Sequence, residues 1–542
     1  MKNYNKKYGP YEIEENTGVI YRYTITEKGK TELKEDIICT TPLIISAFLT
    51  NVNSKNIYVK LSWLNSCSEE EFIVVEKMVL MNRALLKKLY GRSFDMSDEN
   101  IGKLIKYFSY IFANHQGEIT KKLVTEKLGW HIVNDKLEFA PYSDKMFCAP
   151  EVSFEDIYGS INCCGDRDAW YRGYQKLQEG TCIPAKIVIA ASFASCLMKF
   201  FDVDPFIVNF YGKTGIGKTL LLNIASSLWG CPNLIQNNNA SSTALEANLK
   251  FLNSMPLLLD EIKGSDSTEK NLENLAYIFS GGKGKSRGNV LGGLLAPAEK
   301  WENIMICSSE QPYIENGTCN GVINRVLDVD CGDKDLFADL RGTYEFFQSH
   351  YGYARDFFEF FSGNQIEKMV RDYNSDFKEI INWFVENGVS TKQASIGSVL
   401  IIASTMFCVD FFCDIEIALT KEDLLPYLRT EKSIDNFKDV LSSLFGHIDM
   451  NMNSIISDTN TAPHKDAIGC FEGDNLYVNN EFVTKFLDKK ANLRQFNKYL
   501  KNNNLIVADY TGRATVSKSI GGSVAGRCYC FKVSEVNSFL LD

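Results

Sequence analysis

The sequence predicts an α/β protein: a parallel sheet with flanking helices and a helical lid, preceded by a mixed α/β part and followed by a winged helix. Two stretches predict the sheet. An apolar segment, 206–210, leads through a glycine-rich loop into a helix, and a second apolar segment, 255–262, contains two adjacent carboxylates. Apolar runs of this kind are typical of buried parallel strands. A helix, strand, basic turn and strand near the C-terminus indicate the winged helix.

The first part, residues 1–160, mixes strand-like and helical patterns. Segments 19–25 and 57–63 are rich in β-branched and aromatic residues, as strands are. Residues 72–90 have helical periodicity, and a strand pair opens at 128–131. His115 and His131 stand alone, so we expect structural roles for both.

The glycine-rich loop predicts a phosphate-binding site. Residues Gly212-Lys213-Thr214-Gly215-Ile216-Gly217-Lys218-Thr219 fill every fixed position of the pattern G-x-x-x-x-G-K-[ST]. The glycines let backbone N–H groups converge on a phosphate, and the helix N-terminus adds its positive dipole end. We therefore expect ATP here, with Lys218 on the β- and γ-phosphates and Thr219 on Mg²⁺.

The two carboxylates at the end of the second apolar segment make hydrolysis the expected chemistry. We expect this strand beside the loop strand, with both C-terminal ends at the sheet edge where ligands bind. Asp260 would hold Mg²⁺ through water, and Glu261 would polarise the attacking water. Solvated acids at an ordinary strand end would look the same in isolation, but the phosphate loop favours the catalytic interpretation.

The remainder of the central part, residues 161–415, alternates helical and strand patterns. A basic glycine-rich segment, 280–288, lacks the order of a second phosphate loop. We expect helices at 184–201 and from 241, strands at 301–310 and 321–329, and a helical lid over 335–413.

The last part, residues 416–542, carries the winged-helix pattern. We expect an amphipathic helix at 492–500 and paired strands at 505–509 and 527–533. The candidate DNA contacts here are Arg494, Lys498, Arg513, Lys518 and Arg527. The alternative is a solvated, lysine-rich face on a domain that binds only protein.

Composition limits the partners. The chain has 542 residues, 45% hydrophobic and 23% charged, with a formal net charge of −10. Nucleic acid must then be held by local basic patches. No signal peptide is recognisable, and the longest apolar helix candidate, 187–198, is too short to span a bilayer, so we expect a cytoplasmic protein without a membrane partner. The 16 cysteines are scattered, which favours free thiols over zinc or disulfides.

Taken in order, these motifs resemble a family. The phosphate loop, Leu-Leu-Leu-Asp-Glu, the glycine/lysine/arginine segment, a Trp-led strand ending Ser-Ser-Glu, and Asn-Arg-Val-Leu-Asp resemble the AAA+ core of replicative helicases from phages and mobile elements. The resemblance is particularly to the Cch-type, MCM-like helicases of staphylococcal cassette elements. It extends over nearly the whole chain, including Leu-Gly-Trp-His upstream and the winged-helix pattern downstream.

The resemblance implies a hexameric ring around single- and double-stranded DNA, with ATP between subunits and a primase or polymerase of the same element as a further partner. Arg325 matches the arginine finger that reaches the neighbouring subunit's γ-phosphate. Segment 283–300 lies where such helicases carry a pore-facing β-hairpin, which makes Lys283, Lys285 and Arg287 candidate DNA contacts. The usual sensor asparagine or threonine is replaced by Ser308, Ser309 or Glu310, of which we take Ser309.

Three functions remain to be weighed. The first is an ATP-driven DNA helicase in replication of a phage or mobile element. The second is a AAA+ switch or remodeller, for example in phage defence, that does not unwind DNA. The third is a non-catalytic origin-binding module, against which Asp260 and Glu261 argue. The basic segment before the sensor strand favours the first.

Overall fold

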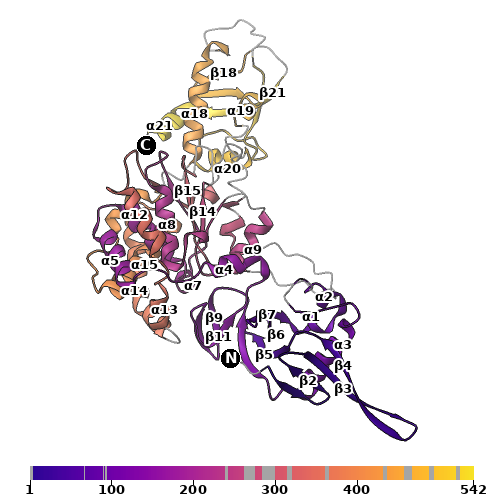
Figure 1. Ribbon diagram of the computed structural model, residues 1–542. Coiled ribbons are helices and arrows are strands. Elements are labelled where there is room, and N and C mark those ends of the chain that lie inside the picture. Colours follow the sequence, from indigo (N-terminus) through magenta and orange to yellow (C-terminus); the bar gives the residue numbers. More distant parts are fainter. Residues whose placement is uncertain are drawn as a thin grey trace.

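A five-stranded, all-parallel sheet lies at the centre of the molecule (Figure 1). In spatial order its strands are β13 (Ile235–Asn237), β14 (Leu257–Asp260), β15 (Met305–Ser309), β12 (Ile207–Tyr211) and β16 (Val326–Asp330). The computed structural model describes residues 4–541 except 66, 90, 92–93, 238–241, 262–274, 277, 284–299, 314–319, 361–364, 431–435, 457–466, 488–492 and 521–524. The strands are buried along nearly their whole length, which explains their continuous apolar sequences.

The order of these strands corrects one expectation. The acidic strand β14 is not beside the loop strand β12, because β15 pairs in parallel with both and lies between them. The two C-terminal ends still meet at the same sheet edge, since all the strands run the same way. A further correction concerns 321–329, which begins with the short helix α11 (Asn320–Ile323) before β16.

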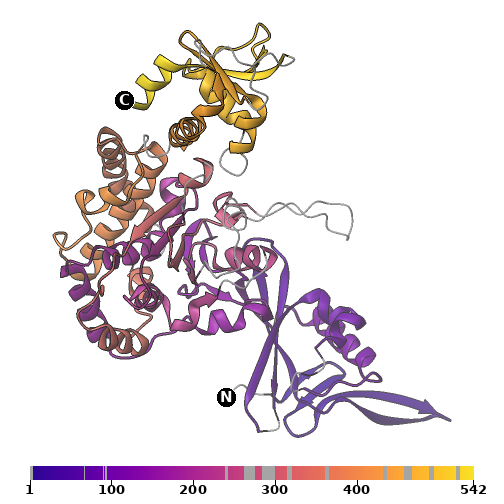
Figure 2. The same cartoon turned by 90° about the horizontal axis from the view of Figure 1, so that it is seen from above.

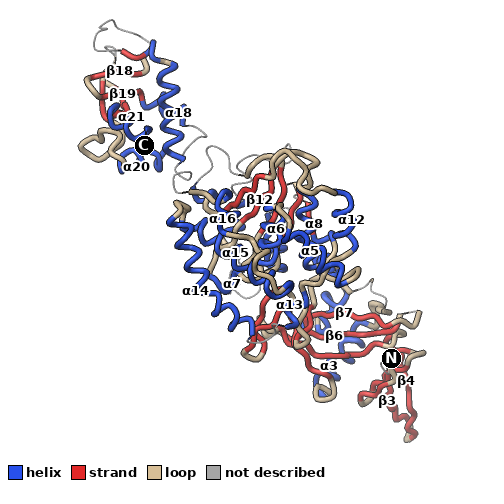
Figure 3. Tube along the Cα trace, turned by 90° about the vertical axis from the view of Figure 1, so that its left-hand side faces the viewer, coloured by secondary structure: helices blue, strands red, loops and turns tan. Residues whose placement is uncertain are grey.

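Helices cover the central sheet and bury the largest of the hydrophobic cores (Figures 1 and 3). The expected helix 184–201 is two helices, α6 and α7, interrupted at 195–197. Besides α11, the described helices around this sheet are α4 (Glu155–Gly159), α5 (Arg167–Glu179), α6 (Ile183–Ala194), α7 (Met198–Phe201), α8 (Lys218–Trp229), α9 (Ser242–Leu252), α12 (Leu340–Ser349), α13 (Arg355–Phe360), α14 (Gln365–Glu386), α15 (Thr391–Phe412) and α16 (Lys421–Leu424).

Among the described helices, α15 alone is long and apolar enough to cross a membrane. The expectation that 187–198 is the longest apolar helix was therefore wrong. In the structure 67% of the apolar window of α15 is buried, and the helix packs against α6 and α14. An apolar helix buried on most sides is a core helix of a large domain.

The N-terminal part contains two further sheets around a second core. Its long hairpin β3–β4 projects from the body of the molecule (Figure 2). The strands are β1 (Lys6–Tyr8), β2 (Tyr11–Glu14), β3 (Gly18–Glu27) and β4 (Lys30–Cys39) in one sheet, and β11 (Met146–Cys148), β8 (Thr120–Thr125), β5 (Leu43–Asn51), β6 (Ile57–Leu64) and β7 (Glu70–Glu76) in the other. The expected strands at 19–25 and 57–63 are present as β3 and β6.

The expected helix over residues 72–90 was wrong in its first part. Residues Glu70–Glu76 form β7, which pairs antiparallel with β6. Helices follow only at α1 (Lys77–Met81) and α2 (Arg83–Lys87), separated by Asn82, whose side chain caps α2. The helix that packs on the sheet is α3 (Ile101–Asn114). The β-branched run Ile73-Val74-Val75 fits a pleated strand better than a helix, and pairing with β6 decides between the two patterns.

The strand pair β9 (Gly129–Val133) and β10 (Lys136–Ala140) connects the N-terminal and central parts. Trp130 packs in the central core, and its Nε1 donates to the carbonyl of Cys196 at 2.6 Å. The N–H of Leu128 donates to the carbonyl of Phe251 at 2.8 Å. These contacts hold the end of the N-terminal part against the sheet that carries the phosphate loop.

His131, on β9, is a buried histidine with a purely structural environment. Its Nε2 lies 3.1 Å from the carbonyl oxygen of Lys127, and its Nδ1 lies 3.2 Å from Nδ2 of Asn53. Burial lowers the pKa of His131 from 6.5 to about 4. The folded state then binds fewer protons than the unfolded state between those values, so stability is present above pH 6.5 and is lost as pH falls toward 4.

We expect β9 and β10 to lose about 2 kcal/mol of stability between pH 7 and pH 5 through this one group. Hydrogen exchange of their amides, corrected for the intrinsic effect of pH, measures the loss. His131→Gln should remove most of the pH dependence, whereas His115→Gln, which replaces a histidine paired with Glu118 near the surface, should retain it. Equal pH dependence in His131→Gln and wild type would contradict this assignment.

The C-terminal part has its own core and a five-stranded sheet (Figure 3). Its strands are β17 (Ile455–Ile456), β18 (Gly469–Glu472), β19 (Asn475–Asn479), β21 (Gly526–Lys532) and β20 (Val516–Lys518), and its helices are α18 (Asn436–Met450), α19 (Asn480–Leu487), α20 (Leu493–Asn502) and α21 (Val533–Leu541). The expected strand 505–509 is only a single bridge between Ile506 and Phe531, and β20 and β19 are the strands that pair with β21.

Candidate functional site: a phosphate loop facing two carboxylates

The glycine-rich loop connects the buried strand β12 to the N-terminus of α8, which begins at Lys218. Gly215 and Gly217 have φ values of +88° and +109°, which L side chains rarely adopt. A Cβ on Gly217 would also lie 2.7 Å from Cδ2 of Leu340, so the loop packs closely under α12. Lys218 Nζ donates to the carbonyls of Gly212 and Lys213, both at 2.7 Å, which keeps the ammonium group over the loop.

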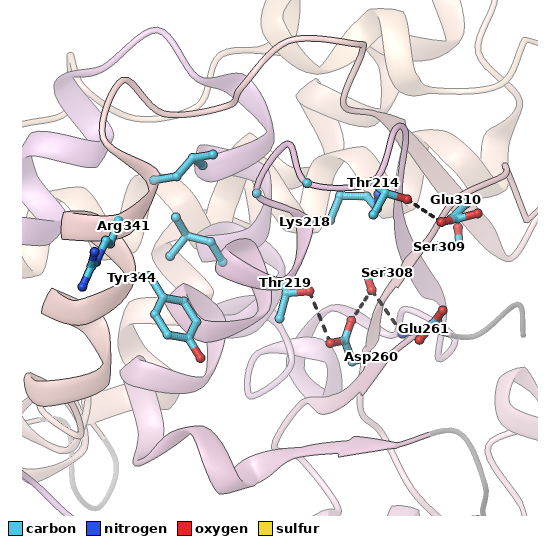
Figure 4. A pocket seen from close by; sticks show the side chains of 14 residues that line it. Thr214, Lys218, Thr219, Asp260, Glu261, Ser308, Ser309, Glu310, Arg341 and Tyr344 are labelled. Atoms are coloured by element: carbon cyan, nitrogen blue, oxygen red, sulfur yellow. Dashed lines mark hydrogen bonds between the residues drawn. The ribbon is translucent and has the colours of Figure 1, made fainter.

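The acidic strand β14 brings its carboxylates to the start of α8 (Figure 4). Asp260 Oδ2 accepts a hydrogen bond from Thr219 Oγ1 at 3.3 Å, and its Oδ1 accepts one from Ser308 Oγ at 2.5 Å. Glu261 has φ of +54°, unusual for a residue other than glycine, and its N–H donates to Ser308 Oγ at 3.2 Å. Backbone strain of this kind clusters at functional sites.

These groups line one cavity of about 500 Å³, within the usual size of a small-molecule site. Its other walls come from β15 and α12. The lining residues are Thr214, Gly215, Gly217, Lys218, Thr219, Leu220, Asp260, Glu261, Ser308, Ser309, Glu310, Leu340, Arg341 and Tyr344. No sequence motif predicted two further side chains that line the cavity, Arg341 and Tyr344 on α12 (Figure 4).

The ligand set fits magnesium more than zinc or iron. Within the described residues, no group of three or more His, Cys, Asp or Glu could enclose a metal ion. Mg²⁺ is usually held by one or two protein oxygens together with substrate phosphates and water. Thr219 and Asp260, already hydrogen-bonded to each other, supply such oxygens beside the phosphate loop.

A buried cysteine, Cys331, lies behind the phosphate loop. Burial raises the pKa of its thiol to about 12, so this cysteine stays neutral.

The three sensor candidates differ in what they contact. Ser308 bonds to Asp260 and to the N–H of Glu261. Ser309 also lines the cavity, but its Oγ bonds away from the carboxylates, to Asn209 Oδ1 at 2.9 Å and to the carbonyl of Gln311. Glu310 accepts from Thr214 Oγ1 at 2.5 Å. Of the three, Ser308 is the one bonded to the carboxylate strand.

Arg325 lies at the N-terminal ends of the strands, whereas the phosphate loop follows the C-terminal end of β12. It precedes β16, and its carbonyl accepts from the N–H of Ile207 at the start of β12. It lines a separate small cavity together with Asp202, Asp204 and Lys392. Arg325 therefore does not face the phosphate cavity of its own chain.

The core candidates for DNA contact are only partly described. Lys283 forms an isolated antiparallel bridge with Lys300, so the two ends of segment 283–300 meet as the base of a hairpin would. The N–H of Trp301 donates to the carbonyl of Gly282 at 3.1 Å and reinforces the pairing. Lys285 and Arg287 lie outside the described residues.

The C-terminal candidates do not all remain available to a ligand. Lys518 pairs with Glu472 at 2.5 Å, and Arg527 pairs with Asp509 at 3.2 Å. Lys498 and Arg513 are exposed. The side chain of Arg494 lies outside the described part of the chain.

Comparison with known proteins supports the fold. The model of the family "Domain of unknown function (DUF927)" matches residues 11–299. A solved structure titled "SCCmec type IV Cch - active helicase" has a TM-score of 0.70 at 14% identity, over 98% of this chain and 99% of that chain. The likeness to Cch-type helicases is thus confirmed for the fold, along the whole length. A second structure, "The A form apo structure of NrS-1 C terminal region-CTR", has a TM-score of 0.25 at 11% identity, over 71% of this chain and 89% of that chain. No curated protein matches the chain.

Proposed function

The chain belongs to the DUF927 family, and we propose that it is an ATP-driven DNA helicase of a phage or mobile element. The observation that carries this proposal is the convergence of Lys218, Thr219, Asp260 and Glu261 on one cavity at the carboxyl edge of a parallel sheet. These are the group types that hold phosphates, magnesium and an attacking water in NTP hydrolysis. The full-length likeness in fold to a structure titled an active helicase adds support.

We assign each residue a role in ATP hydrolysis. The loop amides and Lys218 hold the phosphates, and Thr219 and Asp260 hold Mg²⁺, which neutralises charge on the phosphates. Glu261 polarises the attacking water. Ser308 orients the carboxylate of Asp260 and holds the backbone of Glu261, since it bonds to the side chain of the first and to the N–H of the second.

The contacts favour Ser308 over Ser309 as the sensor. Ser308→Ala should lower the turnover of ATP by at least tenfold with little change in ATP binding, because it frees Asp260 and Glu261 to reorient. Ser309→Ala is the matched control at the next position, where the hydroxyl bonds to the buried Asn209, and it should lower thermal stability more than turnover. Single-turnover hydrolysis and nucleotide titration separate the two effects. A larger loss of turnover in Ser309→Ala would restore our first assignment.

We propose that residues 161–415 form the AAA+ core and lid, 1–160 an N-terminal domain and 416–542 a winged-helix domain, in a cytoplasmic protein. The core would assemble as a hexameric ring around DNA. The position of Arg325 supports this assembly, since Arg325 lines a different cavity from the phosphate loop of its own chain, as a finger for a neighbour's site would. A primase or polymerase of the same element would be a partner of the ring.

The decisive experiment compares unwinding with hydrolysis. We expect single-stranded DNA to stimulate ATP hydrolysis and the protein to displace a strand from a forked duplex. A variant with Lys283, Lys285 and Arg287 all replaced by alanine should lose at least tenfold in strand displacement, while hydrolysis without DNA falls much less. Each lost phosphate contact should also flatten the salt dependence of DNA binding by about one unit of log slope.

A matched control removes the same charge elsewhere. Lys368, Arg371 and Lys378 are exposed on the lid helix α14, and replacing all three with alanine should leave unwinding near wild type. Hydrolysis without strand displacement in the wild type would instead favour a AAA+ switch or remodeller. If the variant without Lys283, Lys285 and Arg287 unwinds DNA normally, these three residues do not contact the DNA during unwinding.

A further inference from the structure

The C-terminal part presents a rigid turn, residues 509–513, between α20 and β20. The Asp509 side chain accepts hydrogen bonds from the N–H of Thr511 and of Arg513, at 2.8 and 2.9 Å, and from the Thr511 hydroxyl at 2.6 Å. The Asp509 backbone closes the turn from both sides, to Gly512 at 2.9 Å and Arg513 at 3.0 Å. Asp509 is thus the centre of a turn whose shape is fixed before any ligand binds.

Two long cations brace this turn from outside. Arg527, on β21, pairs with Asp509 and donates to the carbonyl of Thr515 at 3.0 Å. Lys501, on α20, donates to the carbonyl of Gly512 at 3.1 Å. The hydrogen bonds from Thr511 and Arg513 hold the pKa of Asp509 well below its usual range, so this network persists at neutral and moderately acidic pH.

Tyr510 is at the tip of the turn and is fully exposed, at 101%. A ring that lacks any packing is costly to present to water, and most tyrosines of this chain are at least partly buried. Because the backbone beneath it is fixed, Tyr510 can meet a flat partner with little further loss of backbone entropy.

The charge around the ring indicates the kind of partner. Between residues 493 and 520 the sequence has five cations and a single acid, Asp509, which Arg527 neutralises. Lys501 and Arg513 are exposed at the turn, and Lys498 is exposed three residues before Lys501 on α20, on the same face of the helix. A protein with a net charge of −10 concentrates positive charge here, next to an aromatic ring. Stacking surfaces flanked by cations are the means by which proteins hold single-stranded nucleic acid.

We propose that Tyr510 stacks on an unpaired base of single-stranded DNA, while Lys498, Lys501 and Arg513 contact the neighbouring phosphates. The proposal rests on the DNA-binding function proposed above and adds which DNA the C-terminal part recognises. A stacked base needs a free face, and an internal base pair of a duplex has none. The C-terminal part would therefore select single strands or the unpaired arm of a fork.

The test separates bases from phosphates. Full-length wild type, Tyr510→Ala and Tyr510→Phe are titrated with a labelled oligo-dT strand and with an abasic strand of the same length, which keeps the phosphates but has no bases. Tyr510→Ala should bind oligo-dT about tenfold more weakly than wild type. It should bind the abasic strand equally well, and Tyr510→Phe should restore the affinity for oligo-dT because it keeps the ring.

A variant with Lys498 and Arg513 both replaced by alanine tests the contacts to the DNA phosphates. It should weaken binding to both strands and flatten the salt dependence, whereas Tyr510→Ala should leave the salt slope unchanged. If this double variant weakens binding and Tyr510→Ala does not, the stacking inference is overturned while the proposed DNA-binding function stands. If wild type binds neither strand, the proposed function itself fails. A change in the oligomeric state of Tyr510→Ala without DNA would overturn the inference by making the turn a contact between subunits.

Discussion

Glu261→Gln should lower the rate of ATP hydrolysis by about 10²–10⁴ while ATP still binds. The amide keeps the size and the hydrogen-bonding shape of the carboxylate but cannot draw a proton from water. Glu261 lines the cavity beside Thr219 and Asp260, so loss of its charge should leave the phosphate and magnesium contacts in place. Single-turnover hydrolysis measures the rate, and titration with a fluorescent nucleotide measures binding.

Two controls make this result specific. Glu310→Gln removes a carboxylate from the same cavity. Glu310 directly follows β15 and is bonded to Thr214, so the loss of turnover should be much smaller. Lys218→Ala should abolish nucleotide binding, since Lys218 is the cation over the loop. Turnover near wild type in Glu261→Gln would exclude it as the group that polarises water.

The sequence predicted that the loop residues lie together at one cavity, because the geometry of this loop is local. Eight consecutive residues between a strand and a helix determine where the loop amides and Lys218 lie, and no distant contact is needed. The carboxylates were placed at the correct sheet edge for the same reason, since a run ending in Asp260 must bring that residue to the strand's C-terminal end. The neighbour of that strand was predicted wrongly, because strand order depends on how connecting helices pack.

Features that depend on contacts between distant segments could not be predicted from local sequence motifs. Whether Ser308 or Ser309 faces Asp260 depends on the pairing of β15, and a shift of one residue would exchange them. Arg341 and Tyr344 reach the cavity only because α12 packs over the loop near Gly217. Residues 72–76 carry an apolar spacing that also fits a helix, and pairing with β6 makes them a strand.

Arg325 provides the test of whether the site is shared between subunits. In the structure it is at the start of β16, while the phosphate cavity is at the other end of the same sheet. An arginine finger supplied by a neighbour contributes about 10³–10⁵ to turnover. Arg325→Ala alone should therefore be nearly inactive, with nucleotide binding retained because Lys218 and the loop are intact.

Mixing Arg325→Ala protein with Lys218→Ala protein should restore part of the hydrolysis that each lacks alone. In a mixed ring some interfaces join an intact phosphate loop from one subunit to an intact Arg325 from its neighbour, and only those interfaces turn over. Activity should rise with the mixing ratio, pass through a maximum near equal amounts and fall again. Lys392→Ala is the control, since Lys392 lines the same small cavity as Arg325 but is no finger candidate; mixed with Lys218→Ala protein, it should show no such maximum. If mixed rings are demonstrated by mass spectrometry and hydrolysis does not recover, Arg325 acts within its own chain or not at all, and the shared site is excluded.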